Sequence, residues 1–463
     1  MRKQFQFVYK VSLRISEKSL TNYLSSDYSN YAHTDSSVHI RKISQQAIQF
    51  GQYVLLSLQQ VISQSVLILI TIVSILILNA KLFLLLLCVI IPPVVLAAWL
   101  MKKKLQSLRY QAKQNSEKSI QYLQEALTGF VESNVYDKNL FFLNRFKEFQ
   151  KKLNLHIADQ QTIQGLPSRI IEIFAILGLV VLIILSKEYN RTGISILLIG
   201  AFMGAAYKII PGIVKILNSL GQIKAYNFTV ADILTNDYSP LEIQKNNVSK
   251  ISSIEFENVS FYYNDKRIIN DLNFKIHSSD FVGICGVSGK GKTTIINLLL
   301  GFLEPKSGSI KINDQKTNNI ERHSFLKRIS YTKQQPFFIH DTILKNILLD
   351  NDIHDREKLE QIIQVTGITK MLKTSRENLD YIIDENGKNI SGGERQRITF
   401  ARALYKLADV IILDEAFTEM DEASEMNMLK LLQSLALQGK IIILITHNKN
   451  SFSYCNKIIS LNE

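Results

Sequence analysis

The sequence has few of the residues that mark secreted, fibrous or disordered chains. Its 463 residues include only 3 cysteines, 7 prolines and 20 glycines. Cys88, Cys285 and Cys455 lie far apart and form no CxxC pair, so we expect neither a disulfide framework nor a zinc site. Hydrophobic residues make up 46% of the chain, which excludes a disordered or collagen-like protein. The length predicts about two to four domains.

Acidic charge is scarce in the first half of the chain. Residues 1–250 contain 27 Lys and Arg against 14 Asp and Glu, whereas residues 251–463 contain 27 of each. The net charge of +13 therefore belongs to the half that also contains the long apolar runs. Because basic residues beside apolar runs are typical of cytoplasmic membrane loops, we expect membrane lipids as partners and no nucleic acid.

Four apolar runs predict transmembrane helices. They form two hairpins, the first of residues 61–78 and 82–101 and the second of residues 170–186 and 194–214. Each run approaches the ~20 residues that a helix needs to cross a bilayer. The polar segments around them contain few helix breakers, so we expect long helices that continue the spans into the cytoplasm.

Basic residues predict the orientation of these spans. Residues 102–169 contain twelve Lys and Arg, and the first sixty residues contain seven. The two short turns contain far fewer, so both termini and the long loop are expected in the cytoplasm. The sequence therefore predicts a multi-pass protein of the cytoplasmic membrane.

After Pro240 the pattern changes to short β-branched strands that alternate with helices, which predicts a mainly parallel α/β sheet. The segment 286–293 reads Gly-Val-Ser-Gly-Lys-Gly-Lys-Thr and follows an apolar strand, residues 281–285. Its glycines let backbone N–H groups close around phosphate oxygens at a helix N-terminus. Lys292 is expected to reach the β and γ phosphates, and the Thr293 hydroxyl to bind Mg²⁺. The predicted ATP-binding residues of this segment are Gly286, Val287, Ser288, Gly289, Lys290, Gly291, Lys292, Thr293 and Thr294.

Two further motifs follow the phosphate-binding loop. The apolar strand 410–413 ends in Asp414 and Glu415. Asp414 could hold Mg²⁺ against the phosphates, and Glu415 could orient or activate the attacking water. Ser391, Gly392 and Gly393 enter a helix, and serine with paired glycines there makes a second anion site. One γ-phosphate needs a single cradle, so two cradles suggest a nucleotide held between two copies of the chain.

With these motifs the chain resembles the ABC transporter superfamily, and residues 251–463 resemble its ATPase domain. The resemblance implies that Tyr263 stacks on adenine and that Gln334 contacts the metal and the membrane domain. It also implies that His447 contacts the γ-phosphate, so Glu415, His447, Gln334 and Lys292 are the predicted catalytic residues. Thr293, Gln334 and Asp414 are the predicted metal ligands, and Ser391, Gly392, Gly393 and Glu394 form the predicted signature loop.

The sequence departs from the family pattern at two places in the ATPase half. Glu394 stands where glutamine is usual, which puts a carboxylate near the partner's nucleotide. Residues 418–421 read Thr-Glu-Met-Asp where Ser-Ala-Leu-Asp is common, although Asp421 is retained. Every group needed for hydrolysis is present.

The first half resembles the membrane domain of ABC exporters, whose half-transporters have six spans. Only four runs occur here, so we expect the first two spans to be missing. The expected organisation is an all-α transmembrane domain over residues 1–240, a linker over 241–253, and an α/β P-loop ATPase domain with a helical subdomain over 254–463. Coupling helices are expected at about 27–35 and 137–142.

The resemblance implies an exporter that works as a homodimer or heterodimer and uses ATP and Mg²⁺. Residues 165–169 and 384–389 look most like flippases of lipid-linked oligosaccharides. Export of a peptide or drug is an alternative, as is a transport-incompetent ATPase that needs a partner chain.

Overall fold

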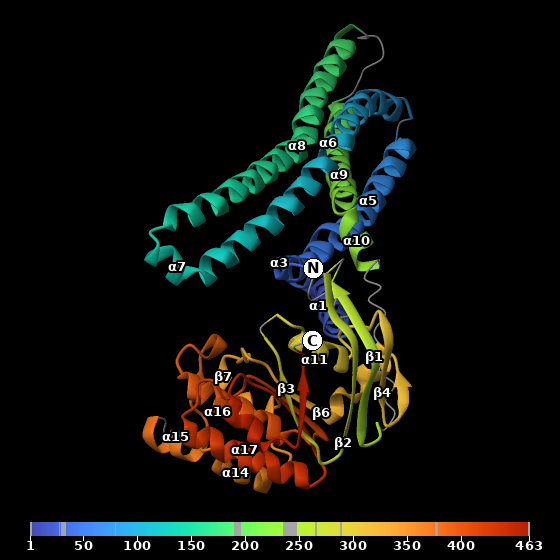
Figure 1. Ribbon diagram of the computed structural model, residues 1–463. Helices are drawn as coiled ribbons and strands as arrows, with labels where there is room; N and C mark the ends of the chain where they lie inside the picture. The colour runs from blue at the N-terminus through green and yellow to red at the C-terminus, as the bar shows by residue number, and fades with distance from the viewer. Residues whose placement is uncertain are drawn as a thin grey trace. The chain divides into compact units, whose positions relative to one another are not determined.

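The structure is a computed structural model. It describes residues 2–26, 28, 34–78, 80–188, 196–234, 248–263, 266–287, 289–375 and 378–461. They form two compact units, one of residues 1–26 and 30–240 and one of residues 27–29 and 241–463 (Figure 1). The described part of the first unit is helical, and the second contains three β-sheets.

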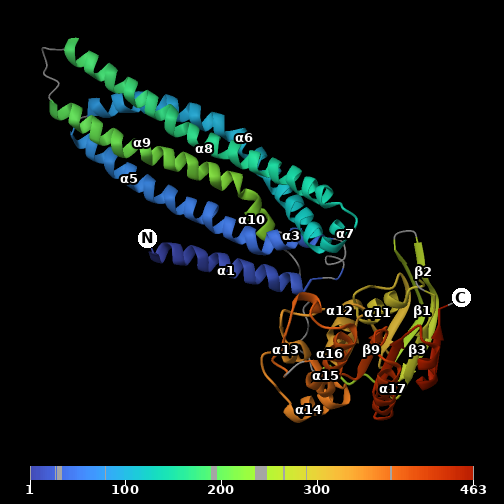
Figure 2. The ribbon, with the colours of Figure 1, turned by 90° about the vertical axis from the view of Figure 1, so that its left-hand side faces the viewer.

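Long helices build the first unit. They are α1 (Arg2–Leu24), α3 (Ser36–Ile40), η1 (Arg41–Gln46), α4 (Ala47–Gln49), η2 (Phe50–Leu55), α5 (Leu56–Leu78), α6 (Ala80–Thr128), α7 (Phe130–Val135), α8 (Asn139–Glu188), α9 (Ile196–Ala225) and α10 (Asn227–Leu234). Figures 1 and 2 show α6 running along α8 and α5 along α9. Val54, Leu105, Ile163 and Tyr226 form a buried cluster where η2, α6, α8 and the end of α9 meet.

The apolar face of α5 is exposed, in contrast to the buried core of a soluble protein. Ile62 is 64% exposed and Ile77 is 80% exposed. Within the described residues, one helical stretch, Ser36–Ile77, is long and apolar enough to cross a membrane. The other predicted spans fall within or overlap α6, α8 and α9, although many of their side chains lie outside the described part of the chain.

The second predicted coupling helix, residues 137–142, covers a turn and the first residues of α8. The short helix α7 (Phe130–Val135) precedes this turn, and α8 begins at Asn139. Asp137 has a φ of 52°, in the left-handed region, and the Lys138 N–H donates to Ser133 O, so the chain turns between α7 and α8. Most of the first predicted coupling helix, residues 27–35, lies outside the described residues.

Two larger sheets organise the second unit. The antiparallel sheet has the order β2 (Lys266–His277), β1 (Ser253–Tyr263), β4 (Ser307–Ile312), β5 (Gln315–Thr317). The parallel sheet has the order β11 (Lys457–Ser460), β3 (Phe281–Cys285), β10 (Ile441–Ile445), β9 (Val410–Asp414), β6 (Ile329–Thr332). A short third sheet pairs β7 (Asp341–Thr342) with β8 (Ile382–Ile383).

The parallel sheet positions the predicted site. Every residue of β9 and β10 is buried, which explains why both strands are nearly continuous runs of Ile, Leu and Val. In such sheets ligands bind beyond the carboxyl ends of the strands. The predicted motifs follow those ends: the phosphate-binding loop after β3, Glu415 after β9 and His447 after β10.

Helices complete the second unit, and four of them form a cluster with its own core. The helices are α11 (Lys292–Leu299), α12 (Asn319–Ser324), α13 (Ile343–Leu348), α14 (Arg356–Val365), α15 (Ile368–Ser375), α16 (Gly392–Tyr405) and α17 (Glu422–Leu437). Phe338, Ile347, Leu359 and Ile398 belong to a buried core of their own that joins α13, α14, α15 and α16. The predicted fold class, a helical domain followed by an α/β domain with a helical subdomain, is confirmed.

Candidate nucleotide site

The phosphate-binding loop has the backbone that its glycines predict. Gly289 and Gly291 have φ values of 82° and 91°, which favour glycine. A Cβ on Gly291 would lie 2.9 Å from Ile268 Cγ2, so β2 leaves no room for a larger residue. Gly291 is the N-cap of α11, so the first N–H groups of that helix follow the loop directly and are suited to an anion. Ser288 lies outside the described residues.

Lys292 is the buried cation of this loop. Its side chain is 8% exposed, and its Nζ donates to Gly286 O over 2.9 Å. The same Nζ lies 3.1 Å from His447 Nε2. The ammonium group is therefore held by the loop and lies beside His447, and the loop and His447 both follow strands of the parallel sheet.

Asp414 is a buried carboxylate at the end of β9. It is 7% exposed, and the Tyr331 hydroxyl donates to its Oδ2 over 3.3 Å. Burial raises the pKa of Asp414, and the hydrogen bond from Tyr331 opposes that shift. Burial also raises the pKa of Tyr331, so its hydroxyl remains a donor. Tyr331 was not among the predicted site residues, since an ordinary strand aromatic carries no sequence signal.

Glu415 is held on both carboxylate oxygens. Gln334 Nε2 donates to Oε2 over 2.7 Å, and His447 Nε2 lies 3.1 Å from Oε1. Glu415 has a φ of 51°, a strained conformation for a non-glycine residue that is often seen at functional sites. His447 Nε2 can donate to Glu415 or accept from Lys292, but one nitrogen cannot do both at once. The predicted catalytic residues Glu415, His447, Gln334 and Lys292 are thus brought together.

The predicted metal ligands have the chemistry that Mg²⁺ prefers. This cation prefers oxygen ligands and usually keeps waters and substrate phosphates, so few protein ligands are needed. The Asp414 carboxylate, the Gln334 amide and the exposed Thr293 hydroxyl supply oxygens of this kind. Among the described residues no group of three or more His, Cys, Asp or Glu could hold a metal ion.

The signature loop begins α16. Ser391 is the N-cap, and the Glu394 N–H donates to Ser391 Oγ over 3.3 Å. The Glu394 carboxylate accepts from the Ser391 N–H over 2.7 Å, which completes a capping box. The unusual glutamate therefore stabilises the first turn of its own helix. A groove of about 910 Å³ runs beside the loop and is also lined by Arg397 and Ser424.

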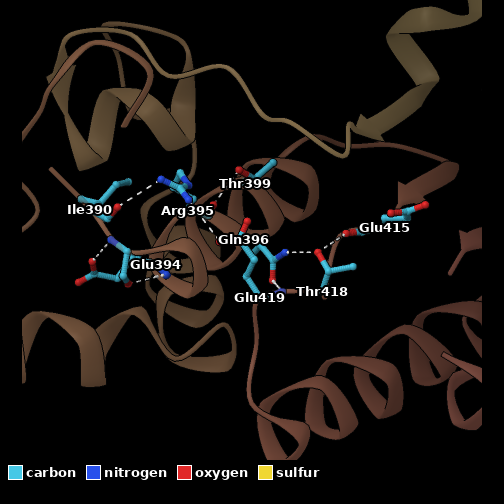
Figure 3. A network of polar contacts seen from close by, with 9 residues as sticks. Ile390, Glu394, Arg395, Gln396, Thr399, Glu415, Thr418 and Glu419 are labelled. Atoms are coloured by element: carbon cyan, nitrogen blue, oxygen red, sulfur yellow. Dashed lines mark hydrogen bonds and ion pairs between the residues drawn. The ribbon is translucent and has the colours of Figure 1, made fainter. Parts of the chain in front are cut away.

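A polar network joins α16, the helix that follows Ser391, to the segment after Glu415 (Figure 3). Gln396 Nε2 donates to Thr418 Oγ1 over 3.1 Å, and Thr418 Oγ1 donates to Glu415 O over 3.3 Å. The Glu419 N–H donates to Gln396 Oε1 over 3.0 Å. Arg395 Nη2 donates to Glu419 Oε2 over 3.2 Å. In the sequence analysis, Thr418 and Glu419 stood out only as departures from the family pattern Ser-Ala-Leu-Asp, and nothing marked Gln396 as a site residue.

Asp421 and Tyr263 are the remaining predicted residues. Asp421 is the N-cap of α17 and accepts from the Ser424 N–H over 2.9 Å, and hydrogen bonds to Ser424 lower its pKa. Arg397 Nη2 lies 3.4 Å from Asp421 Oδ1. Tyr263 ends β1 and is 43% exposed, with its ring at an edge-to-face angle to Phe261. An exposed ring there has a free face for a base.

Comparison with known proteins agrees with this geometry. Two family models match the chain, the ABC transporter transmembrane region over residues 7–205 and the ABC transporter model over residues 269–418. The chain belongs to the ABC transporter superfamily. The two matches cover most of the helical unit and the motifs from Gly286 to Glu415, so the chain has an ABC transmembrane region ahead of an ABC ATP-binding domain.

Two relatives illustrate the similarity. A Rickettsia prowazekii protein named as an export ATP-binding/permease protein is 36% identical over 234 residues, which is 50% of this chain and 40% of that protein. An ATP-dependent lipid A-core flippase of Burkholderia thailandensis is 25% identical over 349 residues, which is 73% of this chain and 58% of the flippase. The chain thus aligns with only part of the length of these relatives.

A solved structure shares the fold. It is a bacterial Atm1-family ABC exporter with ATP bound, with a TM-score of 0.85 and 18% sequence identity. The similarity covers 99% of this chain and 81% of the exporter. At this identity the likeness supports the fold alone.

Proposed function

We propose that this chain binds and hydrolyses ATP and couples hydrolysis to movement of a substrate across the cytoplasmic membrane. Lys292 and the helix N-terminus after Gly291 bind the phosphates, and Mg²⁺ supplies additional positive charge to the phosphates when bound. Glu415 takes the proton of the attacking water, because its carboxylate is already oriented by Gln334 and His447. The observation that carries the proposal is that Gln334 and His447 contact the two carboxylate oxygens of Glu415, while Lys292 lies next to His447.

A dimer follows from the two anion sites. The first turns of α11 and α16 both begin after a glycine- or serine-containing loop and offer backbone N–H groups, and one γ-phosphate occupies only one of these turns. Each Lys292 loop therefore faces the Ser391 loop of a second copy or of a related half-transporter. The ATPase domain and both termini lie in the cytoplasm, where ATP is found.

The substrate is a lipid-linked saccharide or another lipid. Two observations support this class: the similarity to a lipid A-core flippase, and the exposed apolar face of α5. A peptide or drug is the competing class. A chain that needs a different partner for transport is the third possibility.

The test is ATPase activity of the purified protein in lipid nanodiscs, beside Glu415→Gln. Candidate lipid-linked sugars, peptides and drugs are added in turn. Activity that Glu415→Gln abolishes and that one substrate class stimulates supports the proposal and identifies the cargo. If no substrate stimulates the basal activity of this chain alone, but a substrate does so once a second half-transporter is added, the transporter is a heterodimer. Activity that survives in Glu415→Gln, or none in the wild type, overturns it.

A further inference from the structure

Glu419 contacts the signature loop in two ways. Its carboxylate pairs with Arg395 over 3.2 Å, and it lies directly over Gly392, where an added Cβ would overlap it. The family pattern has a small alanine here, so the carboxylate is a feature of this chain. Arg395 also donates to Ile390 O over 3.4 Å, so the ion pair of Arg395 and Glu419 is bonded to the residue just before the loop as well.

The contact continues to the hydrolytic carboxylate. The Gln396 amide is buried and bonded at both ends, accepting from the Glu419 N–H and donating to Thr418 Oγ1. Thr418 in turn donates to the carbonyl of Glu415, whose backbone is in the left-handed region. A strained backbone persists only where its surroundings hold it. Movement at Gly392 therefore reaches Glu415 through one unbroken series of contacts.

We propose that Glu419 is a positioning residue that couples the signature loop to Glu415 of the same chain. This inference rests on the proposed function, in which the Ser391 loop meets the partner's nucleotide while Glu415 acts on the nucleotide of its own chain. Nucleotide in one site then changes the position of Glu415 that serves the other site. Coupling between two binding sites is reciprocal, so the two ATP molecules bind cooperatively.

The magnitudes distinguish positioning from simple stabilisation. The Arg395 and Glu419 side chains are 33% and 54% exposed, and ion pairs this exposed contribute little to stability. Coupling between sites commonly changes affinity by about 5-fold or more. Loss of Glu419 should therefore alter the dependence on ATP while leaving the melting temperature nearly unchanged.

The experiment compares the full-length wild type in nanodiscs with Glu419→Ala, Glu419→Gln and an exchanged pair, Arg395→Glu with Glu419→Arg. Glu422→Gln is the matched control, an exposed carboxylate three residues further along. ATPase rates are measured against ATP concentration for KM, kcat and the Hill coefficient, together with the melting temperature. We expect Glu419→Ala to raise the KM for ATP about 5-fold and to lower the Hill coefficient towards 1. In the exchanged pair, both values should return part of the way to those of the wild type.

Three results would overturn the coupling. One is a wild type with ATPase activity and a Hill coefficient of 1. Another is Glu419→Ala with the KM and Hill coefficient of the wild type and of Glu422→Gln. A third is a loss in Glu419→Ala that is matched by a lower melting temperature and not restored by the exchanged pair. Absence of ATPase activity from the wild type would instead overturn the proposed function, and the coupling with it.

Discussion

Gln334 and Glu415 are joined by a hydrogen bond of 2.7 Å, with Nε2 of the amide donating to Oε2 of the carboxylate. The two residues follow different strands, β6 and β9, which are neighbours in the parallel sheet. His447 Nε2 lies 3.1 Å from the other oxygen. Glu415, the proposed general base, is therefore contacted by residues that follow two other strands of the sheet, β6 and β10.

Glu415→Gln should abolish hydrolysis without abolishing ATP binding. The amide keeps the shape of the side chain but cannot accept the proton of water, and loss of a general base costs about 10² to 10⁴ in rate. We expect kcat to fall by at least 100-fold, while the Kd for ATP changes by less than a few-fold. Steady-state kinetics and fluorescent nucleotide binding would measure the two quantities. Equal losses in binding and rate would show that Glu415 acts mainly in binding.

Lys292→Ala should weaken ATP binding. Its buried ammonium is the cation nearest the loop carbonyl of Gly286, and hydrogen bonds to charged groups contribute about 1.5–3 kcal/mol. We expect the Kd for ATP to rise by about 10- to 100-fold, measured by calorimetry. Lys290→Ala is the control, since that side chain is exposed in the same loop. An equal effect from both variants would mean that general positive charge, and not Lys292, binds the phosphates.

The sequence predicted those parts of the site that are local. The loop 286–293 and the strand ending in Asp414 are continuous motifs, and the predicted strand 281–285 is β3. It could not predict pairings across the sheet, such as Tyr331 with Asp414, because nothing local marks the partner of a buried carboxylate. The sequence also did not mark the turn between α7 and α8, where Asp137 has a φ of 52°.

Asp414→Asn should stabilise the nucleotide-free protein while removing its Mg²⁺-dependent activity. Burial raises the pKa of Asp414 in the folded state, so the folded protein holds this proton to higher pH than the unfolded chain. The resulting stability is present below the unfolded pKa of 3.8 and is lost as pH rises through the folded pKa. At neutral pH the charged carboxylate is therefore a cost that asparagine avoids.

We expect Asp414→Asn to raise the free energy of unfolding of the nucleotide-free protein at pH 7 by about 1 kcal/mol. Denaturant unfolding across the acidic range would measure it, and the difference from the wild type should shrink as pH falls. If the wild type were instead more stable than Asp414→Asn, and increasingly so towards neutral pH, the assigned direction of the Asp414 pKa shift would be wrong.

Gly392→Ala should disrupt the signature loop because of one neighbour. An added Cβ would overlap the Glu419 carboxylate, whereas the backbone of Gly392 is an ordinary one for any residue. We expect the substitution to lower kcat/KM about 10-fold in the wild type and far less in a Glu419→Ala background, since residues in contact couple by roughly 0.5–3 kcal/mol. ATPase assays of the four proteins in the cycle measure this. An equal loss in both backgrounds would show that the methyl group acts on bound nucleotide and not on Glu419.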